Sequence, residues 1–253
     1  MCLSLIAISM SLGRGCMRHW DDSSGLGESN AVEKRSDDKV GENESLTYIV
    51  SNNVAKVLCV SLTAAIGDYV LPSSLGACPV IEIGSFAFHS CTGLTSVAIP
   101  KDVTHFGYGV FEGCSGLTNF CVDVDNSDYR AIGGMLISKD GCLIAVGGGV
   151  SGVTIPEGVS SIGDGAFGCC RKFSSMIIPD GVMSVGGAAF HDCVKLTRLE
   201  IPDSVIAIGA SAFSRCLELR EVRVSAKSKN RISMLLKKAG VDVRNLKFVE
   251  KKE

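Results

Sequence analysis

The strongest constraint in this sequence is a unit that recurs about every 23 residues. Five phenylalanines are separated by 23, 56, 23 and 23 residues, and a cysteine follows each of them three positions later. A glycine precedes each phenylalanine by four positions. The anchors are Phe88, Phe111, Phe167, Phe190 and Phe213, then Cys91, Cys114, Cys170, Cys193 and Cys216, and finally Gly84, Gly107, Gly163, Gly186 and Gly209. Because so short a unit cannot bury its own apolar side, the repeat predicts stacked coils that share one continuous core.

Within each unit, the pattern predicts one strand, a second short extended piece and a compact turn. The copy that begins at Leu196 reads LTRLEIPDSVIAIGASAFSRCLEL. Leu199 and Ile201 alternate with polar residues, which indicates a strand, and Pro202 ends it because proline donates no backbone hydrogen bond. The glycine is expected to permit a backbone turn, and Ala-Phe-x-x-Cys to form one short helical turn. The sequence therefore predicts a mainly β protein with short helical turns.

The register of these anchors resembles the BspA-like leucine-rich repeat family over about residues 69–224. Phe106, Val110 and Phe173 depart from the usual residue types, but each is an apolar replacement. The resemblance implies a right-handed leucine-rich-repeat solenoid of ~23-residue coils, with a parallel sheet lining one face. It also implies a cell-surface or secreted protein with an adhesive role, since such repeats occur in many bacterial and protist surface proteins.

The chain divides into four regions by composition and pattern. Residues 1–16 are largely apolar and are read either as an export-like segment or as a mis-set N-terminus. Residues 17–46 are polar and charged, which predicts a disordered linker. The solenoid is expected over 47–224, with an N-terminal cap at 47–82 and a variant coil at 120–149. In that coil, Met135–Ser138 and Cys142–Val146 flank a Gly-containing turn and predict a β-hairpin.

The repeat stops at residue 225, and residues 225–253 are expected to form a C-terminal cap. Asn230 is the predicted N-cap of a helix that Gly240 ends, and a final strand is expected around Phe248. This segment contains nine Lys or Arg and three Asp or Glu. Without aromatic residues for stacking on bases, it predicts a solvated cap and no specific nucleic-acid site.

The motifs that could carry chemistry have simpler explanations in the repeat. Gly163–Gly168 matches G-x-G-x-x-G, but the repeat anchors already account for Gly163 and Phe167. The chain has no C-x-x-C pair, so the recurring cysteines are expected to form a column of buried thiols. Asp123, Asp125 and Asp128 lack the glycine and glutamate of a calcium loop. No Ser/His/Asp or Cys/His set is forced together by the repeat, so we expect no catalytic residue, cofactor or metal.

The net charge of −2 gives no general attraction to nucleic acid or to an anionic membrane. No apolar run reaches the roughly 18 residues that a membrane-spanning helix needs. We therefore expect no transmembrane segment, and we expect a monomer.

In a solenoid, binding usually takes place on the exposed side of the sheet. Two outward rows can be read down the predicted strands, and their members form the candidate binding face: Ser96, Ala98, Asn119, Cys121, Thr154, Ser175, Ile177, Arg198, Glu200, Glu221 and Arg223. Across neighbouring strands, Arg198 is expected beside Glu221, and Glu200 beside Arg223.

The leading hypothesis is a non-catalytic scaffold that binds a protein or another macromolecule through its solenoid faces, with adhesion at a cell surface as its setting. An intracellular, cytoplasmic structural or regulatory binding module is the alternative, and a fragment of a larger enzyme is a third. The absence of converging titratable residues in the repeat argues against the third.

Overall fold

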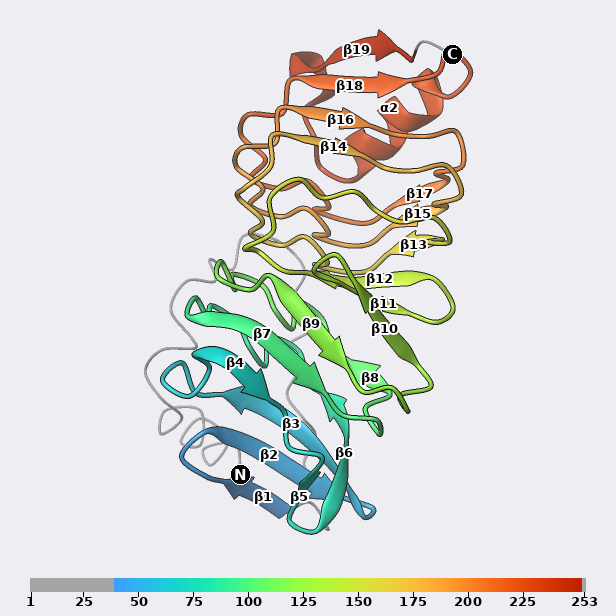
Figure 1. Cartoon of the computed structure of the whole chain (residues 1–253). Coiled ribbons are helices and arrows are strands. Elements are labelled where there is room, and N and C mark those ends of the chain that lie inside the picture. The colour runs from blue at the N-terminus through green and yellow to red at the C-terminus, as the bar shows by residue number, and fades with distance from the viewer. Residues whose placement is uncertain (1–38, 252–253) are drawn as a thin grey trace, which may run out of the picture.

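The computed structural model describes residues 39–251, which wind into a solenoid of about nine turns spaced about 23 residues apart (Figure 1). We call each turn a rung. A regular rung carries one longer strand and one two-residue strand, and these two strands belong to different sheets. The predicted mainly β solenoid of ~23-residue coils is confirmed. The export-like segment 1–16 and residues 17–38 of the predicted linker lie outside the described residues.

The N-terminal half begins with a three-stranded antiparallel meander that caps the first rung. Its strands are β1 (Lys39–Glu42), β2 (Leu46–Ser51) and β3 (Val54–Val60). The longer strands of the following rungs form one parallel sheet: β4 (Gly67–Val70), β7 (Leu94–Ile99) and β9 (Asn119–Val122). The other side of these rungs carries β5 (Ser74–Leu75), β6 (Cys78–Ile83) and β8 (His105–Phe106). Because Lys39–Glu42 pairs with β2, the predicted linker 17–46 is wrong at its C-terminal end.

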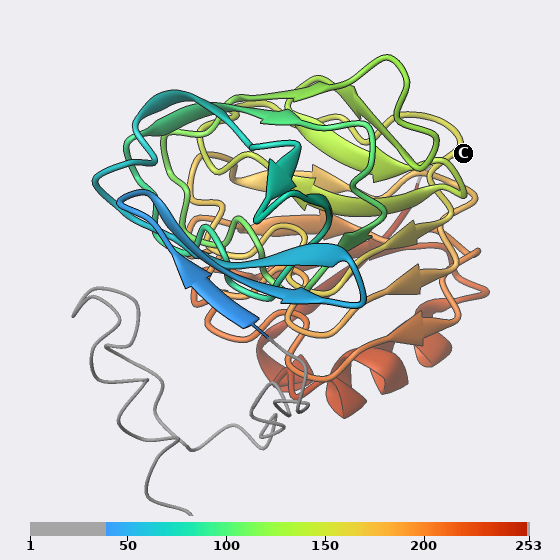
Figure 2. The ribbon, with the colours of Figure 1, turned by 90° about the horizontal axis from the view of Figure 1, so that it is seen from below.

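The C-terminal half repeats this arrangement with a second pair of sheets. Its longer strands are β14 (Ser175–Ile177), β16 (Arg198–Glu200), β18 (Glu221–Val224) and β19 (Lys247–Glu250), which are all parallel. Its two-residue strands are β13 (Ser161–Ile162), β15 (Ser184–Val185) and β17 (Ala207–Ile208), and they continue from the variant coil. Figure 2, seen along the stack, shows the rungs of the two halves lying over one another.

The variant coil forms the predicted hairpin between the two halves. Its strands are β10 (Tyr129–Ile132), β11 (Met135–Ser138) and β12 (Cys142–Val146), and β11 pairs antiparallel with both neighbours. Strand β12 then pairs parallel with β13, so the hairpin stays in the stack. The buried Asn126 fastens it to the preceding rung: its amide donates to the carbonyls of Pro100 (2.9 Å) and Val103 (3.1 Å).

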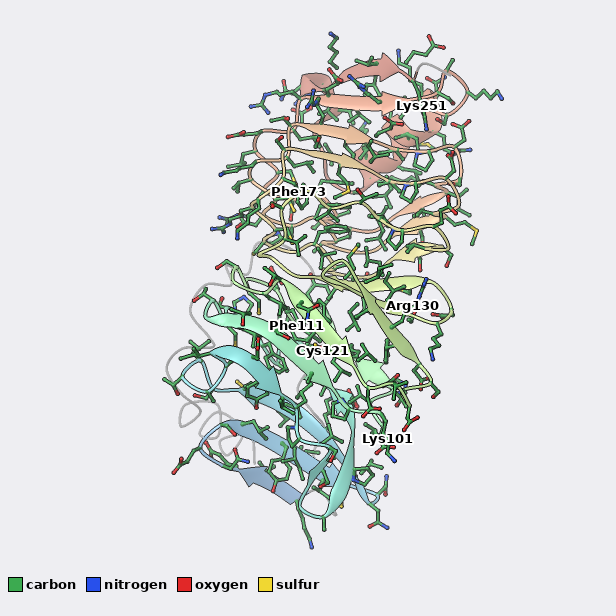
Figure 3. The ribbon with its side chains drawn as sticks, in the orientation of Figure 1. Lys101, Phe111, Cys121, Arg130, Phe173 and Lys251 are labelled. Carbon is green, nitrogen blue, oxygen red and sulfur yellow. The ribbon has the colours of Figure 1, made fainter. Side chains whose placement is uncertain are left out.

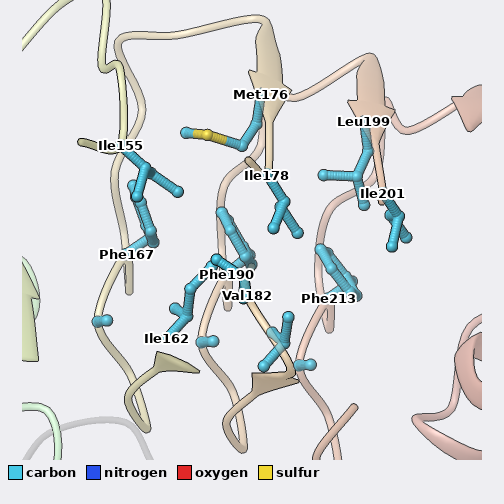
Figure 4. Packing of buried hydrophobic residues seen from close by; sticks show 14 of the residues in the cluster. Ile155, Ile162, Phe167, Met176, Ile178, Val182, Phe190, Leu199, Ile201 and Phe213 are labelled. Carbon is cyan, nitrogen blue, oxygen red and sulfur yellow. The ribbon is translucent and has the colours of Figure 1, made fainter. Parts of the chain in front are cut away.

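The recurring phenylalanines point inward, but they form two columns and not one. Phe88 stacks on Phe111 with ring centroids 5.1 Å apart. Phe190 lies between Phe167 at 4.6 Å and Phe213 at 5.1 Å (Figure 4). The buried apolar residues fall into two clusters, which meet at the hairpin, where Leu136 belongs to one cluster and Ile137 to the other. The expected single continuous core is thus divided by the insertion, because the hairpin side chains separate the two columns.

Close backbone approach, and not a left-handed conformation, requires the repeated glycine. None of the five anchor glycines has a positive φ. A Cβ at Gly107 would lie 2.3 Å from the backbone nitrogen of Ser85, and one at Gly209 would lie 2.4 Å from that of Gly187. These distances are too short for any side chain. Glycine is therefore required at this position, but because of the neighbouring backbone and not because of its own turn conformation, as was expected.

The turn that follows each glycine is a single hydrogen-bonded turn, as predicted. The backbone N–H of each anchor cysteine donates to the carbonyl of the phenylalanine three residues earlier, for example from Cys193 to Phe190 at 3.2 Å. Successive turns also pair with each other, as from Phe167 N–H to the Ala189 carbonyl at 2.7 Å. A third ladder of hydrogen bonds therefore runs along this edge of the stack, besides the two sheets.

The C-terminal cap consists of the helix α2 (Lys229–Lys238), the 3-10 turn η1 (Val243–Asn245) and β19. Ile232 and Leu236 are fully buried and cover the end of the core. The N-cap is Ser228, so the prediction of Asn230 was wrong by two residues. Gly240, with φ of +86°, follows the helix as predicted, and the predicted final strand is β19.

Candidate binding face

The exposed side of the longer strands is the surface on which the predicted residues meet. We call it the long-strand face; it comprises the outward side chains of the sheet β4-β7-β9 and of the sheet β14-β16-β18-β19. The register places Ser96 beside Asn119 and Ala98 beside Cys121. In the second sheet, Ser175 lies beside Arg198, and Ile177 lies beside Glu200. Both outward rows therefore run in register within each sheet.

The side chains of this face differ in exposure and in chemistry. Val70 and Ile177 are 72% and 61% exposed, so each sheet presents one large aliphatic side chain to solvent. Asn119, Cys121, Ser175, Arg198 and Arg223 are also exposed, whereas Ser96, Ala98, Glu200 and Glu221 are half-buried. Apart from the exposed Asp68, which lies beside Ser96, the N-terminal sheet presents small and apolar groups, and the C-terminal sheet presents more charges.

Thr154 does not belong to the sheet, although the repeat places it between Cys121 and Ile177. It is exposed, but residues 151–156 form no strand. The long-strand face is therefore interrupted at this rung, and the continuous sheet that the repeat predicts is wrong here. Gly152, with φ of +79°, leaves the extended conformation in this segment, which explains why the strand does not form.

The charged residues lie in the predicted register, but they form different ion pairs. Arg198 is opposite Glu221, and Glu200 is opposite Arg223. Arg223 nevertheless pairs with Glu221 on its own strand, at 2.8 Å, and this hydrogen bond lowers the pKa of Glu221. Glu200 pairs with Lys251, at 3.0 Å, which raises the pKa of Lys251. The C-terminal cap therefore adds the charge of Lys251 to the face. This charge could not be predicted from the repeat alone.

The anchor cysteines form the predicted column of thiols. Cys91, Cys114, Cys170 and Cys193 are buried, Cys216 is half-buried, and none of the ten described cysteines is disulfide-bonded. Thiols donate to carbonyls of the preceding rung, as from Cys114 Sγ to Phe88 O at 3.0 Å and from Cys193 Sγ to Phe167 O at 3.2 Å. Burial raises the pKa of Cys170 to about 12, so this thiol is a poor nucleophile and packs as a small apolar group.

The turns bring together a serine and a histidine that the sequence analysis missed. His191 Nδ1 lies 2.6 Å from Ser214 Oγ, because both residues directly follow the anchor phenylalanine of successive rungs. That shared rung position is the signal that could have identified the pair. His191 is half-buried, and desolvation lowers its pKa.

This pair lacks the further groups that nucleophilic catalysis needs. The neighbouring Asp192 pairs with Arg171 and with Arg215, the second at 3.1 Å, and within residues 39–251 no carboxylate forms a hydrogen bond with the His191 ring. Glu112 and Cys169 lie on adjoining turns and share a 3.5 Å hydrogen bond. Burial raises the pKa of Cys169 to about 12, which leaves little thiolate at neutral pH. We therefore assign these turns a structural role.

The residues that could suggest a cofactor or metal have packing roles. Gly165, inside the G-x-G-x-x-G match, adopts a φ of +66° in the tight turn between two rungs, where a Cβ would lie 3.2 Å from Gly109 Cα. Asp123 accepts a hydrogen bond from the backbone of Asp125, as in an ordinary loop. Over residues 39–251, no group of His, Cys, Asp and Glu is arranged to hold a metal ion. In the same range, no helix is long and apolar enough to cross a membrane.

Rungs that stack at a 23-residue period, each with a strand facing one side, define a leucine-rich-repeat solenoid. The chain belongs to the BspA-type leucine-rich repeat family, whose profile matches six copies over residues 68–134 and 148–246. No curated protein sequence matches it.

Solved bacterial leucine-rich repeat proteins are similar in fold. One from Bacteroides ovatus is 24% identical with a TM-score of 0.46, and the match covers 74% of this chain. This chain spans only 42% of that protein. The leucine-rich repeat protein of T. pallidum is 21% identical with a TM-score of 0.39, and the match covers 84% of each chain. One from Eubacterium ventriosum is 15% identical with a TM-score of 0.47, covering 73% of this chain and 71% of that one.

Proposed function

We propose that the protein is a non-catalytic scaffold that binds a protein or another macromolecule through its long-strand face, at the cell surface. The observation that carries the proposal is the exposure of Val70 and Ile177, at 72% and 61%, on the same face. Burial of exposed aliphatic side chains against a partner is favourable in water, so these two residues are suited to such a contact. The cell-surface setting rests on membership of the BspA-type family.

The chemistry of the face favours a broad contact. Its outward residues include few of the Tyr, Trp and Arg anchors that dominate tight interfaces. Arg198, Arg223 and Lys247 are exposed cations of the face, and Arg223 is held by Glu221. We therefore expect modest affinity for one contact and stronger attachment through several copies of the protein or ligand.

Site-specific photo-crosslinking on cells of the source organism tests the proposal. A benzophenone amino acid replaces Ile177 on the long-strand face or, as the matched control, Ile206 on the other side of the rung. These side chains are 61% and 64% exposed, so the two probes are almost equally accessible and differ mainly in their location. We expect one discrete crosslinked product from position 177 and none from position 206. Equal products from both positions, or none from position 177, would contradict the proposal.

The intracellular binding module remains the alternative setting for the same face. The ten cysteines that carry no disulfide favour it, because thiols persist in a reducing compartment. Labelling intact cells with a membrane-impermeant biotin reagent separates the two settings. A surface protein becomes labelled before lysis, and an intracellular one only after it.

A further inference from the structure

Positive charge gathers at one corner of the C-terminal half, where the turn after each anchor phenylalanine leads into the long strand. We call it the basic corner, and its exposed cations are Arg171, Lys172, Lys195, Arg198, Arg215, Arg220, Arg223 and Lys247. In Figure 3, Phe173 marks the start of this corner, and Lys251 lies at the opposite end of the long strands. The corresponding residues of the N-terminal half, 89–98 and 112–121, include no Lys or Arg. The basic corner is therefore a property of the C-terminal half.

The buried Asp192 holds two of these cations in place. It is 4% exposed, and its carboxylate accepts hydrogen bonds from Arg171 and from Arg215, the second at 3.1 Å. The two arginine side chains themselves stay 59% and 66% exposed. A guanidinium group has five N–H donors, so N–H groups of both arginines remain for a ligand. Such groups bind carboxylates in a fork-like geometry.

The acids near the basic corner do not cancel its charge. Glu200 and Glu221 are half-buried, and each already forms an ion pair with a cation of the chain. Glu218 is exposed. Lys195 forms no side-chain hydrogen bond or ion pair with another residue of 39–251, and Arg198 lies opposite Glu221 without an ion pair to it. The corner thus presents an excess of positive charge, although the whole chain carries −2.

Exposed aliphatic side chains beside these cations favour a protein partner over other anionic polymers. Leu217 is 71% exposed, and its carbonyl accepts a hydrogen bond from Arg220 at 2.7 Å. Ile177, 61% exposed, lies two strands from Arg223 in the same outward row. Burial of such side chains against aliphatic residues of a protein is favourable, whereas a charged polysaccharide offers no matching groups. Phe173 is buried, so it offers no surface on which a nucleic-acid base could stack.

We propose that the basic corner binds an acidic segment of a partner protein, in which aliphatic residues stand among the carboxylates. The inference rests on the proposed function and names the chemistry of the partner. The carboxylates meet the arginines and lysines, and the aliphatic residues meet Leu217 and Ile177. Exposed charges accelerate association and are screened by salt, so the affinity of this contact depends on ionic strength.

Fluorescence anisotropy with the full chain and a labelled EELEELEE peptide tests the inference. The control peptide QQLQQLQQ lacks the charges, and EESEESEE lacks the aliphatic residues. We expect QQLQQLQQ to bind at least about tenfold more weakly and EESEESEE about threefold more weakly. We also expect the Kd of EELEELEE to rise about fivefold or more between about 0.05 and 0.5 M salt, because the Debye length shortens.

A pair of double variants places the binding at this corner. Lys195→Gln with Arg198→Gln removes two cations of the basic corner, and Lys101→Gln with Arg130→Gln removes one Lys and one Arg elsewhere (Figure 3). All four side chains are exposed, so both variants change the net charge equally at solvent positions. We expect the first variant to raise the Kd of EELEELEE about fivefold or more and the second to change it less than about twofold.

Failure of EELEELEE to bind, equal binding of QQLQQLQQ, or equal effects of the two double variants would overturn the inference. Heparin and duplex DNA serve as competitors. If either binds more tightly than EELEELEE and loses its affinity in the first double variant, the corner serves another class of polymer and the inference is likewise overturned. The crosslink from position 177 separates the two proposals: if it forms while the peptide fails, the long-strand face is still the binding surface and only the acidic partner is rejected.

Discussion

At the scale of single residues, Glu112 has the least compensated charge among the buried acids. It is 8% exposed, and it accepts a hydrogen bond from the thiol of Cys169 at 3.5 Å. Asp192, the other buried acid, has two arginines. Burial therefore raises the pKa of Glu112 above its usual value near 4.5, with the charge of Asp192 adding to the effect. The folded protein thus binds this proton more tightly than the unfolded chain.

The raised pKa of Glu112 determines in which direction the stability of the protein changes with pH. Because the folded-state pKa is the higher one, the contribution of Glu112 to stability falls as the pH rises from about 4.5 through the raised pKa. We expect Glu112→Gln to be more stable than the wild type at pH 7, with the difference shrinking towards pH 4. Urea midpoints of both proteins across this range provide the measurement. A difference that stays constant with pH would contradict the shift.

The sequence was sufficient to predict which residues point inward. It was not sufficient to predict why glycine is required at its position in each repeat. A five-fold repetition of Phe and Cys can arise only if each occupies the same buried place. The glycine anchor looked like a conformational requirement, but Gly107 and Gly209 are needed because a neighbouring backbone lies within 2.4 Å of any Cβ. Such a contact between rungs is invisible until the rungs are placed side by side.

At the scale of elements, Asn126 holds the inserted hairpin in the stack. It is 2% exposed; it donates to Pro100 and Val103 and accepts from the backbone N–H groups of Asp128 and Tyr129 at 2.9 and 2.8 Å. Loss of this side chain would leave the carbonyl of Val103 and the N–H groups of Asp128 and Tyr129 without this partner, whereas the Pro100 carbonyl keeps the N–H of Val103 at 3.4 Å. The hairpin in turn contributes residues to both core clusters.

We expect Asn126→Ala to lower the free energy of unfolding by about 2–4 kcal/mol, since unsatisfied buried groups cost about 1–3 kcal/mol each and water reaches some of them. Asn119→Ala, at an exposed position on β9, is the matched control and should change it by less than about 0.5 kcal/mol. Urea denaturation followed by circular dichroism measures both. Similar small losses in the two variants would show that the amide does not fasten the hairpin.

The strands and the hairpin were predictable, whereas the interruption of the face was not. Alternating apolar residues around Leu199 specify a strand in any rung, and the Gly-containing turn of the hairpin specifies its reversal. The rung at Thr154 keeps the same apolar pattern, yet it forms no strand, because Gly152 leaves the extended conformation with a φ of +79°. The ion pair between Glu200 and Lys251 could not be predicted either, because Lys251 lies outside the repeat.

At the scale of the whole molecule, stacked rungs explain both the stability and the binding surface. Each regular rung packs its anchor Phe against a neighbouring rung, and its long strand contributes one residue to each of the two outward rows. Nearest-neighbour contacts of this kind make the stability of a solenoid a sum over interfaces. The long-strand face is therefore only as regular as the stack, and it is interrupted between β9 and β14.

Urea unfolding of Phe190→Ala tests most directly whether rungs stack around a shared interior. Phe190 is fully buried between Phe167 and Phe213, and its loss should lower the free energy of unfolding by about 3–5 kcal/mol. Ile206→Ala, at a 64% exposed position of a neighbouring rung, should change it by less than about 0.5 kcal/mol. Equal and small losses in the two variants would contradict the inward column and the stacked solenoid with it.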